Sequence, residues 1–546
     1  MSTITVTIPD RRVSASAQAL QRLIESSFAS RLWSGDDTIW GAEAQPEASI
    51  RLGWLRAAEI SAPLVPEILA LRDALAERGV DRFVLAGMGG SSLAPELITQ
   101  AAGVRLHILD TTDPQQLRAV IEHDLDRTAV VVSSKSGSTL ETDSQRRAYE
   151  QAFREAGIDP AERIIVVTDP GSPLDENARA AGYRVFNADA NVGGRYSALT
   201  AFGLVPSGLA GVDIVTLLDE ARAASAELVA DSVDNPALRL AATLAADPAQ
   251  VDKFAVAAGD GKLAQLPAWI EQLVAESTGK QGVGVLPIAV RVHSPEITSP
   301  TADVQPVLVG TSFEPLAEYS LSGALSVVAP LGAQLLVWEV ATAALGALLE
   351  INPFDQPDVE SAKAAARALL EHPLDDAKPA YTEAGVRVYA PGAQPDLHAV
   401  SSLTGALEAL FATLDPELGY LAVQIYADRL GHNALEQVRD EFAQALNRPV
   451  TFGWGPRFLH STGQYHKGGP AEGVFLQITR VSDDALAIPD RPFGFAQLLR
   501  AQATGDAQVL ADHGLPVLRI EIDDDAHLQQ VLQTAVSVAG RQVGEA

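Results

Sequence analysis

Short runs of apolar residues alternate along the chain with longer segments in which apolar residues recur every three or four positions. The runs 83–87, 105–110, 129–134 and 163–169 are mostly apolar, and each ends in polar turn residues. Short apolar strands that alternate with helices predict a parallel sheet covered on both faces. We therefore expect a doubly wound α/β domain over residues 79–232.

A second alternating set of apolar runs follows toward the C-terminus, interrupted near 373–415 by a stretch in which we predict irregular structure. Residues 1–78 instead show the spacing of amphipathic helices, and Gly79 follows them at the position of a helix C-cap. The fold class predicted is α/β, with two doubly wound parallel-sheet domains, 79–232 and 233–546, after a helical N-terminal arm.

Composition narrows the classes of function. Hydrophobic residues make up 47% of the 546, enough for two or three cores. The net charge of −30 disfavours nucleic acid and anionic membrane surfaces as partners. The absence of cysteine excludes disulfides, thiolate zinc sites and a cysteine nucleophile.

Two segments bear on localisation. The apolar run that begins at Leu331 contains Gln334 and Glu339, so we expect a buried helix rather than a membrane span. The N-terminus shows no basic segment followed by an apolar core. We expect a cytoplasmic protein.

Ligands of doubly wound sheets bind beyond the carboxyl ends of the strands, so the loops there are where chemistry is expected. The first such loop is AGMGGSSLAPEL, residues 86–97. Its glycines at 87, 89 and 90 permit a tight turn and leave backbone N–H groups ahead of a helix N-terminus, an arrangement that suits an anion.

Two other interpretations of this loop stay open. Asp110 ends the next strand, as a dinucleotide site requires, but Leu93 and Ala94 stand where the third glycine of that fingerprint belongs. The loop is also compatible with a simple strand–helix turn in which Ser91 or Ser92 caps the helix.

The second loop is VVVSSKSGSTLET, residues 130–142. Its STLE segment has the spacing of a capping box at the start of a helix. Four hydroxyl groups exceed what one cap requires, and phosphate oxygens need many donors. These residues are Ser134, Ser136, Ser138 and Thr139. The loop therefore favours a phosphate site over capping alone.

Five blocks between residues 86 and 363 together resemble phosphoglucose isomerase, a family of two sugar isomerase (SIS) domains. GMGGSSLAPEL is similar to the family's G-x-G-G-S-x-L-G-P loop, and SSKSGSTLET to its S-K-T-x-T-T-x-E-T phosphate loop. NVGGRYSALTAFGLVP is similar to G-G-R-[FY]-S, QLVAESTGK to Q-G-x-x-E-S-x-G-K, and INPFDQPDVESAK to F-D-Q-x-G-V-E-x-x-K.

A sixth block is out of order. FLHSTGQYHKGG, residues 458–469, resembles the family's H-S-x-G-Q segment, which in the family precedes the F-D-Q segment. We therefore expect a second domain with rearranged C-terminal strands, like that of isomerase segments fused to transaldolase. The resemblance also implies a homodimer in which this histidine comes from the neighbouring subunit.

The resemblance implies that the chain interconverts glucose 6-phosphate and fructose 6-phosphate through a cis-enediol, without a metal or cofactor. Glu276 then moves the proton between C2 and C1, and Arg195 stabilises the enediolate, since a guanidinium keeps its charge. His460 and Lys363 share ring opening, with His466 as a competing candidate. Each of these residues could instead be structural: Glu276 an exposed helix-end acid, Arg195 half of a structural ion pair.

The resemblance assigns substrate binding to the two loops and to two glutamines. These residues are Gly89, Gly90, Ser91, Ser134, Lys135, Ser136, Ser138, Thr139, Glu141, Gln272 and Gln356. The expected partner is a sugar phosphate. Two alternatives stay open, a dual phosphoglucose/phosphomannose isomerase and a non-catalytic SIS regulator that binds sugar phosphates.

Overall fold

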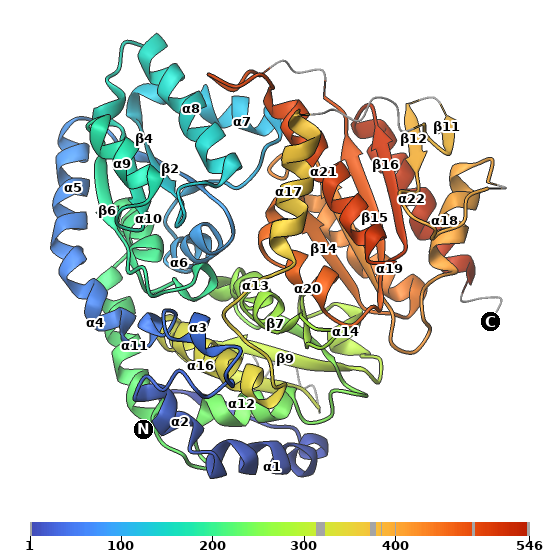
Figure 1. Cartoon of the computed structure of the whole chain (residues 1–546), viewed down its shortest axis with the longest axis horizontal. Coiled ribbons are helices and arrows are strands. Elements are labelled where there is room, and N and C mark those ends of the chain that lie inside the picture. Colours follow the sequence, from blue (N-terminus) through green and yellow to red (C-terminus); the bar gives the residue numbers. More distant parts are fainter. Residues whose placement is uncertain are drawn as a thin grey trace.

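The computed structural model of the chain describes residues 3–312, 323–371, 378–383, 385–398, 400–482 and 486–542. It contains three β-sheets, each covered by helices, which Figure 1 shows in sequence colours from blue-green through green to orange-red. The predicted α/β class with doubly wound parallel sheets is confirmed.

The first sheet carries the two loops singled out from the sequence. Its strands are β2 (Arg82–Gly87), β3 (His107–Leu109), β4 (Thr128–Ser133), β5 (Ile164–Thr168) and β6 (Arg184–Asn187). All pair in parallel in the order β3-β2-β4-β5-β6. The order reverses at β2, so the carboxyl ends of β2 and β4 flank the position where such a sheet binds its ligand.

Helices connect these strands and cover both faces of the first sheet. They are α6 (Leu93–Ala101), α7 (Pro114–Ile121), α8 (Leu140–Glu155), α9 (Pro173–Ala180) and α10 (Ala201–Ala210). Strands β2, β4 and β5 are buried along their whole length, as their near-continuous apolar sequences predict.

The second sheet repeats the winding of the first. Its strands are β1 (Thr5–Thr7), β7 (Lys253–Ala258), β8 (Leu286–Ala289), β9 (Val304–Gly310) and β10 (Leu325–Val328). Their order is β1-β10-β9-β7-β8, with only β1 antiparallel. Its helices are α11 (Ile214–Leu228), α12 (Pro236–Leu244), α13 (Leu266–Thr278), α14 (Pro295–Thr298) and α16 (Leu331–Leu348).

The N-terminal arm is helical as predicted, apart from β1, which joins the edge of the second sheet. Its helices are α1 (Asp10–Glu25), α2 (Phe28–Trp33), α3 (Gln45–Ala48), α4 (Ala57–Ser61) and α5 (Val65–Glu77). The arm shares one apolar core with the first two sheets.

Helix α16 is the apolar run that the sequence analysis expected to be buried. Among the described residues it is the one helix whose length and composition would suit a membrane span, and 89% of it is buried inside the protein. It packs against α11, α12 and α13. The prediction of a buried core helix is confirmed.

The third sheet is formed by the last part of the chain. Its strands are β11 (Tyr381–Glu383), β12 (Val386–Tyr389), β13 (Tyr420–Tyr426), β14 (Val450–Trp454), β15 (Gly473–Arg480) and β16 (Val517–Ile522). The order is β11-β12-β16-β15-β13-β14, with β13 to β16 parallel. Its helices are α17 (Val359–Glu371), α18 (Leu403–Phe411), α19 (Val438–Leu446), α20 (Gly463–Gly468), α21 (Phe495–Asp512) and α22 (Asp525–Gln542).

The third sheet differs from what the sequence predicted in two respects. The strands of residues 233–546, expected in one domain, lie in two sheets, and the third sheet has an apolar core of its own. The stretch near 373–415, expected to be irregular, contains β11, β12 and α18 within its described part. The apolar runs of the two sheets look alike in the sequence. Which sheet a strand joins depends on its pairing with strands that are distant in the sequence, and the local pattern does not record that pairing.

Largely buried ion pairs join the third sheet to the first. Arg429, after β13, and Arg457, after β14, each contact both Glu96 of α6 and Asp110 at the end of β3. We call these four residues the Arg–acid cluster. Burial alone would raise the pKa of Glu96, but Arg457 and Arg429 lower it to about 2. The two positive charges of the arginines balance the two negative charges of the acids, as charges removed from water require.

Candidate active site

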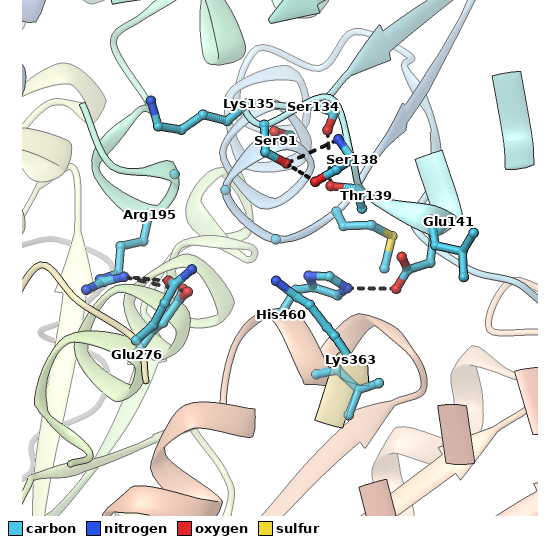
Figure 2. A pocket seen from close by; sticks show the side chains of 18 of the residues that line it. Ser91, Ser134, Lys135, Ser138, Thr139, Glu141, Arg195, Glu276, Lys363 and His460 are labelled. Atoms are coloured by element: carbon cyan, nitrogen blue, oxygen red, sulfur yellow. Dashed lines mark hydrogen bonds and ion pairs between the residues drawn. The ribbon is translucent and has the colours of Figure 1, made fainter. Parts of the chain in front are cut away.

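One pocket, with a cavity volume of about 500 Å³, lies where loops of all three sheets meet. Every residue that the sequence analysis assigned to catalysis or to binding lines it. Figure 2 shows the serine-rich loop on one side, Arg195 and Glu276 on a second, and His460 with Lys363 and Glu141 on a third. The structure therefore brings together residues that lie far apart in the sequence.

The glycine loop after β2 forms one wall of the pocket. Gly89 has a φ of +56°, a conformation that favours glycine. A Cβ atom at Gly90 would lie 2.0 Å from the carbonyl oxygen of Gly194, so only glycine permits this approach. Ser92 stands at the N-cap of α6 without a side-chain capping bond. The N-cap position that the capping interpretation gives to Ser92 is confirmed, but the Ser92 hydroxyl donates to the carbonyl oxygen of Gly89 and caps no N–H group.

The serine-rich loop after β4 forms a second wall. Ser134 Oγ donates to Thr139 Oγ1 at 3.0 Å, and the hydroxyls of Ser136 and Ser138 lie 2.8 Å apart. Thr139 is the N-cap of α8, and its side chain makes no capping hydrogen bond. The expected capping box is absent, and Glu141 turns into the pocket instead. The hydroxyls and the first N–H groups of α8 thus border one polar space.

Arg195 lies in the turn Gly194–Tyr196 and is buried. Its guanidinium donates to Ser277 Oγ at 2.7 Å, to Gln356 Oε1 at 2.9 Å and to the carbonyl oxygen of Pro353 at 2.7 Å. Its Nη1 lies 3.6 Å from Glu276 Oε1. These bonds fix a permanent positive charge beside a carboxylate.

Glu276 is 7% exposed and lies on α13, not at an exposed helix end. Gln272, one turn earlier, donates to Glu276 Oε2 at 3.2 Å and to the carbonyl oxygen of His460 at 2.8 Å. The i, i+4 spacing places both side chains on one helix face, as predicted. Gln272 thereby joins the carboxylate to the segment that carries the histidine.

Lys280, just after α13, anchors the loop that carries Gln356. Its Nζ donates to the carbonyl oxygens of Asn352 and Asp355, at 2.8 and 2.6 Å, and to Asp355 Oδ1 at 2.7 Å. Burial lowers the pKa of Lys280 to about 8. Helix α17 follows this loop and presents Lys363 to the pocket.

His460 ends the turn Arg457–His460, which follows β14. Its Nε2 donates to Glu141 Oε1 at 2.8 Å on one side of the pocket. Burial alone would raise the pKa of Glu141, but the charge and the hydrogen bond of His460 hold it below its usual value. The donor and the acceptor belong to the same chain, so the histidine reaches this pocket without a partner subunit.

His466, the competing histidine, does not line the pocket. It is buried in α20 with Nδ1 at 2.9 Å from the hydroxyl of Tyr420, and its ring stacks on that tyrosine. Burial lowers its pKa to about 3. It is therefore a neutral packing residue, and His460 is the histidine that faces the pocket.

Asp110 was the acid of the dinucleotide interpretation. Both of its carboxylate oxygens are taken by guanidinium groups of the Arg–acid cluster. It therefore has little acceptor capacity left for a ribose, which removes the remaining support for that interpretation. Within the described residues no group of three His, Asp or Glu side chains is arranged to hold a metal ion.

Several pocket residues were not predicted from the sequence. Among them are Arg51, Asp169, Ala366, Lys467 and Gln502. Gln502 lies on α21, one turn after Leu498, and is a buried polar residue on a helix whose buried positions are mostly apolar. The position of this polar residue on the helix was the only indication in the sequence that Gln502 is functional. It does not indicate which side chain Gln502 contacts.

A family model described as phosphoglucose isomerase matches residues 73–303. The chain is 30% identical over 383 residues to a probable glucose-6-phosphate isomerase of Natronomonas pharaonis. The aligned region covers 61% of this chain and 90% of that protein. The chain is 32% identical over 387 residues to a glucose-6-phosphate isomerase of Thermus thermophilus, covering 59% of this chain and 91% of that protein.

Solved structures agree in fold. A hypothetical protein from Thermus thermophilus superposes with a TM-score of 0.56 at 27% identity, covering 67% of this chain and all of that chain. A glucose-6-phosphate isomerase from Chlamydia trachomatis superposes with a TM-score of 0.57 at 23% identity, covering 68% of this chain and 89% of the other.

Proposed function

This chain belongs to the phosphoglucose isomerase family, and from that premise we infer that it interconverts glucose 6-phosphate and fructose 6-phosphate. The reaction turns an aldehyde at C1 and a hydroxyl at C2 into a hydroxyl at C1 and a ketone at C2. It needs a proton carrier and a stabilised enediolate, and no electrons leave the sugar. The observation that supports this most is the pairing of Glu276 with Arg195 in a pocket that the serine-rich loop also lines.

Glu276 is the base that takes the proton from C2 and returns it to C1. Its carboxylate is shielded from water, which favours proton transfer to the substrate. Gln272 fixes one carboxylate oxygen, so the other, Oε1, faces Arg195 and the space that the sugar would occupy.

Arg195 stabilises the negative charge that develops on O1 and O2 in the enediolate. Its bonds to Ser277, Gln356 and the backbone of Pro353 are made before any substrate enters. A charge that is already oriented needs no reorganisation during the reaction, and such preorganisation is a major source of catalysis.

His460 and Lys363 open the pyranose ring. Ring opening needs a donor to the ring oxygen and a base at the C1 hydroxyl. The imidazole of His460, held by Glu141, and the amine of Lys363 both border the pocket on the side opposite Arg195. We assign donation to the ring oxygen to His460.

The serine-rich loop binds the phosphate. The hydroxyls of Ser134, Ser136, Ser138 and Thr139, with the N–H groups at the start of α8, present donors to one anion. Lys135 adds a positive charge, although its amine is paired with Asp169. The net charge of −30 makes these local donors necessary.

A coupled assay of the purified protein with fructose 6-phosphate tests the function. We expect turnover without added metal, loss of it in His460→Ala, and retained proton exchange on an open-chain substrate in that variant. Mannose 6-phosphate, assayed in parallel, separates a dual-specificity isomerase from a glucose-specific one. Binding of the sugar phosphate without turnover by the wild-type protein would instead identify a regulator.

The homodimer and the cytoplasmic location expected from the sequence stay predictions. Because His460 and Glu141 of one chain meet directly, a dimer is not required to supply the histidine. Sedimentation of the purified protein measures the oligomeric state, and fractionation of the source cells measures the location.

A further inference from the structure

We propose that Gln502 is a positioning residue for the isomerase reaction, which holds the Glu141 carboxylate in the orientation that orders His460. The inference rests on the proposed function of the pocket. It adds a residue of α21, a helix that covers the third sheet and lies outside all the blocks that resemble the family.

Gln502 is 5% exposed and uses both ends of its amide. Its Nε2 donates to Glu141 Oε1 at 2.7 Å, and its Oε1 accepts from Thr112 Oγ1 at 2.7 Å. Thr112 follows β3, and Glu141 belongs to α8, so both partners come from the first sheet. The amide therefore connects the third sheet to the first at the edge of the pocket.

The orientation of the amide follows from chemistry. An ionised carboxylate only accepts hydrogen bonds, so the NH₂ group of Gln502 must face Glu141 and its carbonyl oxygen must face the threonine. The hydroxyl of Thr112 can donate, and it does so here. The chain Thr112–Gln502–Glu141–His460 is thus a directed set of hydrogen bonds.

Two donors converge on one oxygen of Glu141. His460 Nε2 and Gln502 Nε2 lie 2.8 and 2.7 Å from the same Oε1. With only one of the two, the carboxylate could rotate about its last bond and still keep its partner. With both, the plane of the carboxylate is set, and the imidazole is held at one angle to the pocket.

The charged and titratable groups around Glu141 come from several elements. They are His460 of the turn after β14, Lys363 of α17 and Tyr426 of β13. On α21 itself, Asp506 is one turn beyond Gln502 and is paired with Lys467 of α20 at 2.6 Å. Gln502 is the neutral donor in this set, so it stabilises the charged carboxylate without altering the charge balance.

Helix α21 also packs closely on α17, which carries Lys363. A Cβ atom at Gly505 would lie 2.9 Å from the backbone nitrogen of Ala366. Gln502 is therefore held on a helix that is fixed against the second ring-opening group, which suits a positioning role.

The test compares Gln502→Met with the wild-type protein. Methionine keeps the length and the packing of the side chain and removes both hydrogen bonds. We expect kcat to fall about tenfold, as for the loss of one hydrogen bond to a charged group, with KM changed less than about twofold because the phosphate loop is untouched. We also expect the acid limb of the kcat/KM profile to move to higher pH by about one unit.

The sign of the pH shift follows from the carboxylate. The N–H of Gln502 stabilises the charged form of Glu141, so its removal raises the pKa of that group. The ionised form of Glu141 is then lost at a higher pH, so the enzyme stays active over a narrower pH range on the acid side. A role confined to packing would lower the melting temperature and leave the pH profile unmoved.

Two further variants keep the test sharp. Gln508→Met makes the same substitution on the same helix at an exposed position that bonds only Asp512, and we expect no kinetic change. Thr112→Val removes the bond to Gln502 alone, and we expect a smaller loss of kcat that is not additive with Gln502→Met. Full additivity, or an unmoved pH profile in an active Gln502→Met protein, would overturn the inference.

A measurement without turnover separates this inference from the proposed function. The ring signals of His460, assigned by their loss in His460→Ala, are titrated by NMR in the wild-type, Gln502→Met and Gln508→Met proteins. We expect the titration to change only in Gln502→Met. If the wild-type protein proved inactive, the function would fail; if this titration were unchanged, the positioning role would fail.

Discussion

At the scale of the residue, Glu276 and Arg195 show how burial and pairing prepare a site for chemistry. The carboxylate lies 3.6 Å from a guanidinium that is itself held by Ser277, Gln356 and the backbone. Because the neighbours of the two groups fix their orientation, we expect substitutions at the pocket to affect binding and turnover separately.

Glu276→Gln is expected to lower kcat by about a thousandfold or more, because the shape is kept and the base is lost. Binding of fructose 6-phosphate, measured by calorimetry, should change only a few-fold. The matched control is Glu271→Gln on the same helix. Burial raises the pKa of Glu271 to about 7, so a neutral amide there resembles the natural state near neutral pH and activity should persist. Continued exchange of the C2 proton with solvent in Glu276→Gln would contradict the assignment.

Ser134→Ala and Thr139→Val are expected to raise KM about tenfold with little change in kcat, since the phosphate is bound alike in ground and transition states. Ser144→Ala, which removes a hydroxyl bonded to the Leu140 carbonyl oxygen in the same helix, is the control for stability. The readouts are steady-state kinetics and melting temperature. Variants that melted earlier with an unchanged KM would show that these hydroxyls only support the loop.

At the scale of the element, the turn Arg457–His460 contributes both to the contact between the third and first sheets and to the pocket. Its first residue belongs to the Arg–acid cluster and its last bonds Glu141. Gln272 holds the carbonyl oxygen of His460 from the second sheet. The turn is thus fixed at both ends by elements of different sheets, which sets where the imidazole lies.

Arg457→Met is expected to destabilise the protein by about 3 kcal/mol, because it leaves an excess of buried negative charge. Arg439→Met is the matched control: it breaks the buried pair with Glu296, also between the third sheet and its neighbour, but away from the turn. Calorimetry should show comparable losses of melting temperature. Only Arg457→Met should also lose kcat, and equal kinetic losses would mean that the cluster acts on stability alone.

At the scale of the whole molecule, three sheets with the same winding meet around one pocket, and a single chain supplies every group that the proposed mechanism uses. The first sheet contributes the glycine-rich and serine-rich loops, α13 of the second contributes Glu276, and the third contributes His460 and Gln502. Loops that converge from separate sheets can tolerate a change in the order of their segments along the chain.

Mixing two inactive variants tests whether the site is complete in one chain. If His460 came from a partner subunit, His460→Ala and Glu276→Gln mixed in equal amounts and allowed to exchange subunits would regain about a quarter of wild-type activity. We expect no recovery, because both residues face the same pocket of the same chain. The measurement is the initial rate after incubation, with each variant alone as the control.

The sequence by itself determined the doubly wound α/β class, the two strand-end loops and the residues around the pocket, because buried parallel strands and glycine- or serine-rich turns leave local patterns. It did not separate the second sheet from the third, since the apolar runs of both look alike and only strand pairing distinguishes them. The tertiary structure alone decided that His460, despite its altered place in the chain, meets Glu141 of the same chain while His466 packs on Tyr420. It also decided the partners of Arg457 and Gln502, because hydrogen bonds and ion pairs between distant segments depend on how the sheets dock, and no local pattern records that.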